Sequence, residues 1–328
     1  MKIKEVNAQE YEVFASLEPN ANIFQSNLYA EVLLKKGYEP LFIEYLNDND
    51  IAQAFGAFYI KKDSFFSFKP SAYCFSGFLT NYYDHKLLKV FIVDLIEYFK
   101  TKNIKKIVID PFVFLNEGKY SNQSITKVIT ENGFVKSDDK YFYFYNMNNN
   151  NKSKTMQNIF LKTIQLEKDY KQLHTLVNQE SLDIYNSFKD KTILYAIELN
   201  VSKSITELNN ELTNTNEFVA KNKDDIKLSQ DVYDTLQRIK QINESLSYLD
   251  KFKQDKVITC VICIIKYSDK YYVLFLNDNN DSFLNYKELL LKDINKDAKK
   301  DDIKIIYSLN EMPNSDKQEL IGEYTFNY

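Results

Sequence analysis

The segments ITELNNELTNTNEFV (205–219) and LSQDVYDTLQRIKQINESLSYL (228–249) decide how the rest of the chain is arranged. Apolar side chains or threonines recur in both at alternating steps of three and four residues, namely Ile205, Leu208, Leu212, Thr215, Val219, and Leu228, Val232, Thr235, Ile239, Ile242, Leu246, Leu249. This is the spacing of helices that pack along a shared seam. The polar segment NKDD (222–225) separates them, which predicts an antiparallel coiled-coil helical hairpin over 203–254.

The hairpin is flanked on both sides by β-type sequence. Before it, strands are predicted at 158–164 and 193–199, with a helix over 167–188 between them. After it come the apolar runs VITCVICII (257–265) and KYYVLFL (270–276). A helix near 284–300 and the strands DIKIIYS (302–308) and ELIGEYTFNY (319–328) complete the chain. The hairpin is therefore expected to be an insertion in an α/β domain.

The first half of the chain also alternates between helical and strand periods. Helices are predicted over 23–36, 85–100 and 121–132, and strands over 39–46, 53–62, 71–76, 105–110 and 141–146. The strand at 105–110 ends at Asp110 because Pro111 has no backbone N–H to donate. Strands mixed with packing helices indicate an α/β or α+β fold.

The best predicted boundary between domains is the polar, asparagine-rich run NMNNNNKSK (146–154). We expect a first domain over 1–145, a linker over 146–155, and a shortened second domain over 156–328 that carries the hairpin.

Composition excludes several classes of function. Of 328 residues, 44% are hydrophobic and 27% charged, which is typical of globular proteins, and the net charge of −4 gives no sign of a polyanion partner. Only Arg238 is an arginine. The six glycines are isolated, so there is no G-x-G-x-x-G motif and no P-loop. The N-terminus does not resemble a signal peptide, and no run is long enough to span a membrane.

The cysteines and histidines do not form a recognisable metal or catalytic site. Cys260 and Cys263 are three residues apart in a predicted strand and so point to opposite faces, as core residues do. His85 and His174 have no cysteine, serine or metal partner in the pattern, and we expect them to be structural. No metal ion is expected.

Five motifs occur in an order that resembles one family. They are IFQSNLYAEVLLKKGY (23–38), SGFLTNY (76–82), KKIVIDPF (105–112), LYAIELNVSKSITELNNEL (194–212) and ELIGEYTF (319–326). Together with the hairpin, they resemble the FemABX family, whose members add amino acids from aminoacyl-tRNA to the stem peptide of cell-wall precursors. The resemblance implies two N-acetyltransferase-like domains, with the hairpin projecting from the second.

The same resemblance implies a substrate site made by Lys36, Gly77, Asn81, Tyr82 and Asp110. It implies no cofactor, with aminoacyl-tRNA as co-substrate. The expected partners are a UDP-linked or lipid-linked muropeptide, charged tRNA and a homologous family member. The expected location is the bacterial cytoplasm, with a peripheral position at the inner face of the membrane left open.

The chain departs from the family pattern at its cationic positions. Leu33 stands where the family usually has a lysine, and Ser76 and Asn81 stand where it has an arginine and an aspartate. Asn310 and Glu311 lie where it has a Phe-Lys pair near the reacting ester. Catalytic residues are therefore not assigned. Two functions stay open: aminoacyl transfer of the family type, or a catalytically degenerate member that binds a muropeptide or supports a partner.

Overall fold

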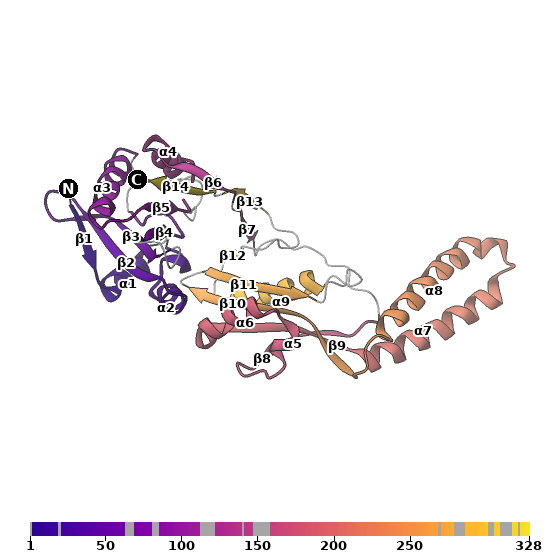
Figure 1. Cartoon of the computed structure of the whole chain (residues 1–328). Helices are drawn as coiled ribbons and strands as arrows, with labels where there is room; N and C mark the ends of the chain where they lie inside the picture. The colour runs from indigo at the N-terminus through magenta and orange to yellow at the C-terminus, as the bar shows by residue number, and fades with distance from the viewer. Residues whose placement is uncertain are drawn as a thin grey trace.

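The chain forms two β-sheets that lie beside each other, with a pair of long helices projecting from one end (Figure 1). The computed structural model describes residues 2–18, 21–62, 69–80, 85–111, 122–139, 141–146, 158–267, 270–278, 286–300, 305–308, 317–320 and 322–328. None of the helices in these ranges is long and apolar enough to cross a membrane.

The first sheet has seven strands. Their spatial order is β1 (Lys2–Val6), β2 (Glu39–Leu46), β3 (Ala52–Lys61), β4 (Ser71–Cys74), β5 (Lys106–Ile109), β14 (Glu323–Asn327) and β6 (Val135–Asp138). Neighbouring strands are antiparallel except β4 and β5, which run parallel with Ser71 opposite Lys106. Because parallel strands need a crossover, the long helix α3 (His85–Thr101) connects this pair.

Helices cover both faces of the first sheet. On one face, α3 and α4 (Asn122–Glu131) pack on a core that includes Phe58 and Phe91. On the other face, α1 (Ala8–Leu17), the short 3-10 helix η1 (Ile23–Gln25) and α2 (Asn27–Lys35) form the helical layer, and α1 and α2 pack on Phe42 and Tyr59. The predicted amphipathic helix at 85–100 is thus confirmed, and the predicted helix at 23–36 is present as η1 and α2.

The second sheet also has seven strands. Their order is β8 (Leu161–Leu166), β9 (Thr192–Asn200), β10 (Lys256–Tyr267), β11 (Lys270–Asp278), β12 (Ile305–Ser308), β7 (Tyr141–Asn146) and β13 (Lys317–Leu320). Helices α5 (Leu173–Leu176) and α6 (Gln179–Phe188) lie on one face, followed by the 3-10 helix η2 (Lys189–Lys191). Helix α9 (Tyr286–Lys300) lies on the other face and connects the parallel strands β11 and β12.

The two cysteines of the C-x-x-C sequence are core residues, as expected. Both are buried, and no disulfide joins them. Cys260 packs in the cluster beneath α9, whereas Cys263 packs in the cluster beneath α5 and α6. The two thiols therefore lie on opposite faces of the sheet.

Each sheet contains one strand from the other half of the chain. The two sheets have the same order of strand directions when the first is counted from β1 and the second from β8. Strands one to four are paired antiparallel, the fifth is parallel to the fourth, and the sixth comes from the other half of the chain. In the first sheet that sixth strand is β14, from the C-terminus, which pairs with β5 and β6. In the second sheet it is β7, which pairs with β12 and β13. The exchange ties the two halves together.

The predicted domain boundaries do not coincide with this division. A first domain over 1–145 would contain β7, yet β7 belongs to the second sheet. A second domain over 156–328 would contain β14, yet β14 belongs to the first sheet. The difference arises because local composition carries no information about strands that are exchanged between the sheets. The linear boundaries stay a prediction.

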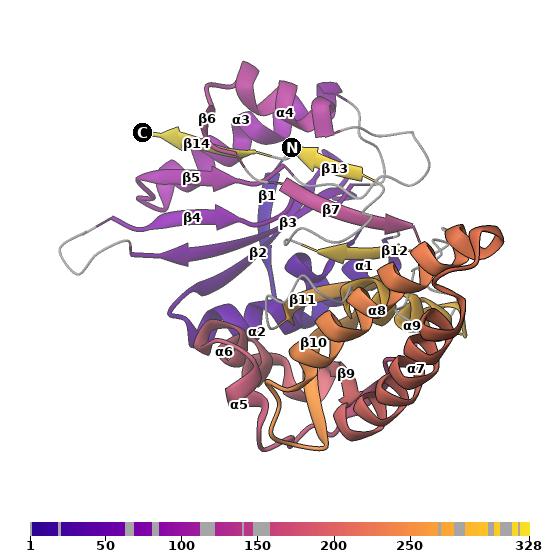
Figure 2. The same cartoon turned by 90° about the vertical axis from the view of Figure 1, so that its right-hand side faces the viewer.

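The projecting helices are α7 (Val201–Asn222) and α8 (Ser229–Leu249), joined through the 3-10 helix η3 (Ile226–Leu228). They lie side by side and extend away from the sheets (Figures 1 and 2). Every position of the two predicted seams is buried or half-buried, and Leu208, Ile242 and Leu249 are fully buried at the base. Supercoiling of the pair stays a prediction.

The only arginine of the chain joins the two helices of this hairpin to each other. Arg238 on α8 binds Glu211 on α7 in a bidentate way, through Nε at 2.6 Å and Nη2 at 2.8 Å. Asn158, which lies before β8, donates its Nδ2–H to the same carboxylate at 2.7 Å. The hydrogen bonds from Arg238 hold the pKa of Glu211 below its ordinary value. Planar arginine suits this bidentate contact better than lysine does.

We expect Arg238→Ala to lower the free energy of unfolding by about 1–3 kcal/mol at pH 7, because charge-assisted hydrogen bonds are lost. Glu211 has a lowered folded-state pKa, so its contribution is present above about pH 4.5 and is lost as the pH falls through that folded-state value. Urea unfolding at pH 7 and pH 3 should therefore show a smaller penalty in acid.

The matched control is Lys240→Ala, which removes an exposed lysine whose Nζ lies 4.0 Å from Glu244 on the same helix. Such surface pairs contribute about 0–1 kcal/mol. Equal penalties for Arg238→Ala at both pH values would contradict the assigned role of the Glu211 carboxylate.

Candidate functional site

Asp110 lies where the two parallel strands of the first sheet end. The N–H of Asp110 donates to the carbonyl oxygen of Cys74 at 2.9 Å, which extends the β4–β5 pairing by one step. Pro111 then ends the ladder. Only 6% of Asp110 is exposed. Carboxyl ends of parallel strands meet at one edge of a sheet, and such edges are common binding positions in α/β folds.

The turn after β4 is held by a buried glutamine. Gln25 at the end of η1 donates its Nε2–H to the carbonyl oxygen of Gly77 at 2.6 Å, and its Oε1 accepts the N–H of Asn22 at 3.1 Å. The side chain of Gln25 thus connects two of the motifs identified in the sequence. Ser76, next to Gly77, is 1% exposed, so its side chain is packed in the protein.

Tyr29 on α2 joins the Asp110 edge to the surrounding aromatic residues. Its ring is perpendicular to those of Phe24, Tyr59 and Phe75, with centroids 5.2–6.0 Å apart. Burial, and then the negative charge of Asp110, raise the pKa of the Tyr29 hydroxyl. Tyr29 is therefore neutral at physiological pH, and its O–H is able to donate a hydrogen bond.

A cavity of about 140 Å³ opens beside Tyr29 between the two halves of the chain. Its lining is almost entirely apolar and comes from η1, α2, α6 and β11: Ile23, Phe24, Tyr29, Val32, Leu33, Lys36, Ile184, Phe188, Tyr272, Val273 and Leu274. Lys36 is the one charged residue in this lining and is exposed, whereas Leu33 is buried. A cavity of this volume accepts a group about as large as benzene.

Polar contacts fix the two walls of this cavity relative to each other. The carboxylate of Glu12 on α1 accepts a hydrogen bond from the backbone N–H of Asn27, at the start of α2, at 2.7 Å. The same carboxylate accepts a hydrogen bond from the hydroxyl of Tyr267, at the end of β10, at 3.3 Å. Burial, followed by the charge of Glu12, raises the pKa of Tyr267. Glu12 therefore positions α2 against the second sheet.

A further group of aromatic rings lies beyond α2, and two lysine side chains lie against it. Tyr38 and Tyr73 meet edge to face, and Tyr73 stacks on Phe75. The ammonium of Lys61 lies 4.2 Å from the Tyr38 ring centroid, and that of Lys106 lies 5.6 Å from the Tyr73 ring centroid. Cations at these distances are attracted to the ring faces.

The structure thus brings three of the five predicted site residues into one region. Asp110 and Gly77 belong to the same strand-end edge, and Lys36 lies in the wall of the adjoining cavity. Asn81 and Tyr82 lie outside the described residues. Glu12 was not predicted as a site residue. Tyr29 and the aromatic rings around it were not predicted either, since tyrosine is common throughout this chain and gives no local signal. The described residues contain no group of three or more side chains suited to a metal ion.

A model of the FemAB family matches residues 6–179, which is more than half of the chain. The chain belongs to the FemAB family. The matched segment of this FemAB member includes η1, α2, the Gly77 turn and Asp110. A comparison with curated proteins finds no match.

Solved structures show how the FemAB fold is shared. The crystal structure of FemX is 14% identical, with a TM-score of 0.62, and the alignment covers 100% of this chain and 98% of that one. A tandem GNAT protein from the clavulanic acid biosynthesis pathway is 8% identical, with a TM-score of 0.50 and coverage of 99% and 98%. The expected acetyltransferase-like α/β fold is therefore confirmed.

Proposed function

We propose that this chain is an aminoacyltransferase that extends the stem peptide of a peptidoglycan precursor. An amine nitrogen of the stem peptide attacks the ester carbonyl carbon of an aminoacyl-tRNA. The amide C–N bond forms, the ester C–O bond breaks, and the proton lost by the amine leaves with the terminal ribose hydroxyl. Membership of the FemAB family and the likeness of fold to FemX support this class of reaction.

The observation that carries the proposal is Asp110 at the strand-end edge, beside Tyr29 and the apolar cavity. In this proposal the Asp110 carboxylate accepts a hydrogen bond from the acceptor amine and orients it toward the ester. The cavity takes an apolar group of the peptide, and Lys36 at its wall faces the phosphates of a UDP-linked or lipid-linked precursor. Such positioning accounts for much of the rate of a two-substrate reaction.

The proposal needs no cofactor besides the aminoacyl-tRNA co-substrate. A precursor that is UDP-linked or lipid-linked places the reaction in the bacterial cytoplasm, at or near the inner face of the membrane. The protein would act there alone or beside a homologous family member.

A second candidate function is binding of the muropeptide without catalysis, alone or as a partner of an active relative. The chemistry of the cavity wall favours it. Leu33 is apolar and Ser76 is packed inside the protein, so neither supplies the cation that the resemblance implies at its position. The segment with Asn310 and Glu311 lies outside the described residues.

A single-turnover transfer assay with charged tRNA and lipid-linked precursor separates the two functions. We expect the isolated protein to transfer slowly, since loss of one preorganised charge near the reacting ester costs about 10²–10³-fold in rate. The assay is run with the protein alone and with a co-expressed FemAB-family member. A transfer rate that depends entirely on the relative would support the second function instead.

We expect Lys36→Gln to weaken binding of a UDP-linked muropeptide about tenfold, because it removes the one charged group of the cavity lining. Isothermal titration calorimetry at low and high salt measures the effect, and the difference between wild type and variant should diminish as salt screens the charge. The matched control is Lys35→Gln, which removes the same charge from the neighbouring exposed position, outside the cavity lining. Equal weakening by both variants would show that the cavity does not hold the phosphates.

A further inference from the structure

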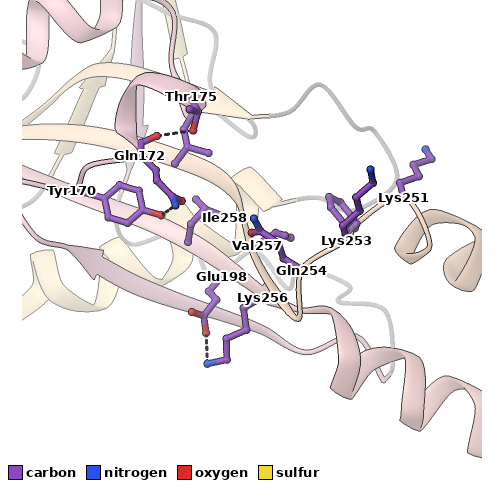
Figure 3. A pocket seen from close by; sticks show the side chains of 12 residues that line it. Tyr170, Gln172, Thr175, Glu198, Lys251, Lys253, Gln254, Lys256, Val257 and Ile258 are labelled. Atoms are coloured by element: carbon purple, nitrogen blue, oxygen red, sulfur yellow. Dashed lines mark hydrogen bonds and ion pairs between the residues drawn. The ribbon is translucent and has the colours of Figure 1, made fainter.

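A second cavity lies at the base of the helical hairpin, where β10 begins (Figure 3). Its volume is about 430 Å³. One wall is the turn around α5, at residues 170–176, and the other is the segment 251–258 that carries the chain from α8 into β10. Glu198 of β9 completes the lining.

This cavity is separate from the cavity beside Tyr29, with which it shares no lining residue. Lys256, at the start of β10, lines it. Tyr267, at the end of the same strand, contacts Glu12 and packs against the cluster of Ile23 and Val32, two residues that line the first cavity. A twelve-residue strand rises about 3.3 Å per residue, so the two places are about 35 Å apart. No small ligand occupies both.

The charged groups of the lining are mostly cationic. Lys251, Lys253 and Lys256 stand against one acidic residue, Glu198, although the whole chain has a net charge of −4. Glu198 pairs with Lys256 at 3.2 Å. Among the described residues, no carboxylate pairs with Lys251 or Lys253; the Lys251 ammonium instead lies 5.2 Å from the Tyr248 ring centroid. The cavity therefore has two cationic groups without an acidic partner in that part of the chain.

The rest of the lining offers both hydrogen bonds and apolar contact. Figure 3 shows Tyr170, Gln172 and Thr175 on one side of the cavity and Gln254 on the other, with Val257 and Ile258 between them. Gln172 accepts hydrogen bonds from Tyr170 at its side-chain oxygen, at 3.4 Å, and from Thr175 at its carbonyl oxygen, at 2.7 Å. A ligand with a charged end and a less polar remainder would match both parts of this surface.

We propose that this cavity binds a small phosphate ester, with the phosphate between Lys251 and Lys253 and the remainder on Val257 and Ile258. Two ammonium groups match the two charges of a phosphate monoester at neutral pH, and lysine serves phosphate as a point charge. No arginine lines the cavity, so recognition there rests on the charge of the two ammonium groups and not on a bidentate fork. This inference does not rest on the proposed transferase activity.

The test is titration calorimetry of the full chain with phenyl phosphate and with inorganic phosphate, at about 50 mM salt. We expect saturable binding of both, with phenyl phosphate the tighter ligand. In the double variant Lys251→Gln, Lys253→Gln the affinity for phenyl phosphate should fall at least about tenfold. Both lysines are exposed, so the variant should fold normally, as its melting temperature would show.

The matched control is Lys221→Gln, Lys223→Gln, which removes two exposed lysines with the same spacing near the tip of the hairpin. Its affinity should stay within about twofold of the wild type. Equal weakening in both double variants, or no saturable binding of phenyl phosphate, would overturn the proposal. Binding of a single-stranded RNA or of phosphatidylglycerol vesicles without binding of phenyl phosphate would also overturn it. The lysines would then recognise phosphate groups only as part of a polymer or a lipid surface.

Discussion

Ending the chain at residue 321, which removes β14, is expected to abolish cooperative folding of the first sheet. β14 is an interior strand that pairs with β5 on one side and β6 on the other. Tyr324 and Phe326 of this strand pack in the core beneath α3 and α4. Loss of a buried aromatic side chain costs about 3–5 kcal/mol, and a domain has about 5–15 kcal/mol of stability in all. Differential scanning calorimetry and far-UV circular dichroism measure the outcome.

The control for this truncation is deletion of Tyr328 alone, which leaves β14 complete. Tyr328 is 46% exposed and lies beyond the last strand residue, Asn327. We expect this shorter truncation to shift the melting temperature by only a few degrees, whereas loss of β14 removes the transition. Survival of a cooperative transition without β14, within about 5 °C of the full chain, would mean that the strand exchange contributes little to stability.

Asp110→Asn is expected to lower the single-turnover rate of aminoacyl transfer about 100-fold. The substitution keeps the shape of the side chain but removes the negative charge that orients the acceptor amine in the proposed mechanism. Binding of the precursor should weaken much less, because the cavity wall and Lys36 are unchanged. The rate and the dissociation constant are measured on the same preparations.

The matched control is Asp138→Asn, which makes the same chemical change at an exposed position on β6 of the same sheet. Its transfer rate should equal that of the wild type. Should Asp110→Asn transfer as fast as this control, Asp110 would have only a structural role at the end of β5. A matched melting temperature for Asp110→Asn excludes misfolding as the cause of a lower rate.

Much of the secondary structure could be predicted because it depends on local periodicity. The helix α3 follows from its apolar spacing, and both helices of the hairpin follow from their three- and four-residue steps. The end of β5 follows from Asp110-Pro111, where the ladder loses a donor. These features need only neighbours within a few residues in the sequence.

The pairing of distant strands could not be predicted in this way. The sequence YFYFYN indicates a strand at 141–146, but the pattern is equally compatible with either sheet. The same holds for the C-terminal strand, which returns to the first sheet across the whole chain. β7 and β14 each take the equivalent position in the sheet of the other half of the chain, and such an exchange leaves no signal in the local sequence.

The candidate site was predictable only in part for a related reason. Asp110 and Gly77 stood out through motifs, and the structure places both at one sheet edge. The contacts of Gln25, Glu12 and Tyr29 each join segments far apart in the sequence. The cavity at the base of the hairpin likewise needs two separate turns to meet. Such contacts are products of the tertiary fold.

Photo-crosslinking with a muropeptide precursor shows whether the cavity beside Tyr29 holds this substrate. A diazirine on the stem peptide is activated in the presence of the full chain, and the labelled segments are identified by mass spectrometry. We expect labels on residues 23–36, which include η1 and α2, and on residues 272–274 of β11, and we expect unlabelled precursor to compete. Labels concentrated at 170–176 and 251–258, or spread over the surface without competition, would contradict it.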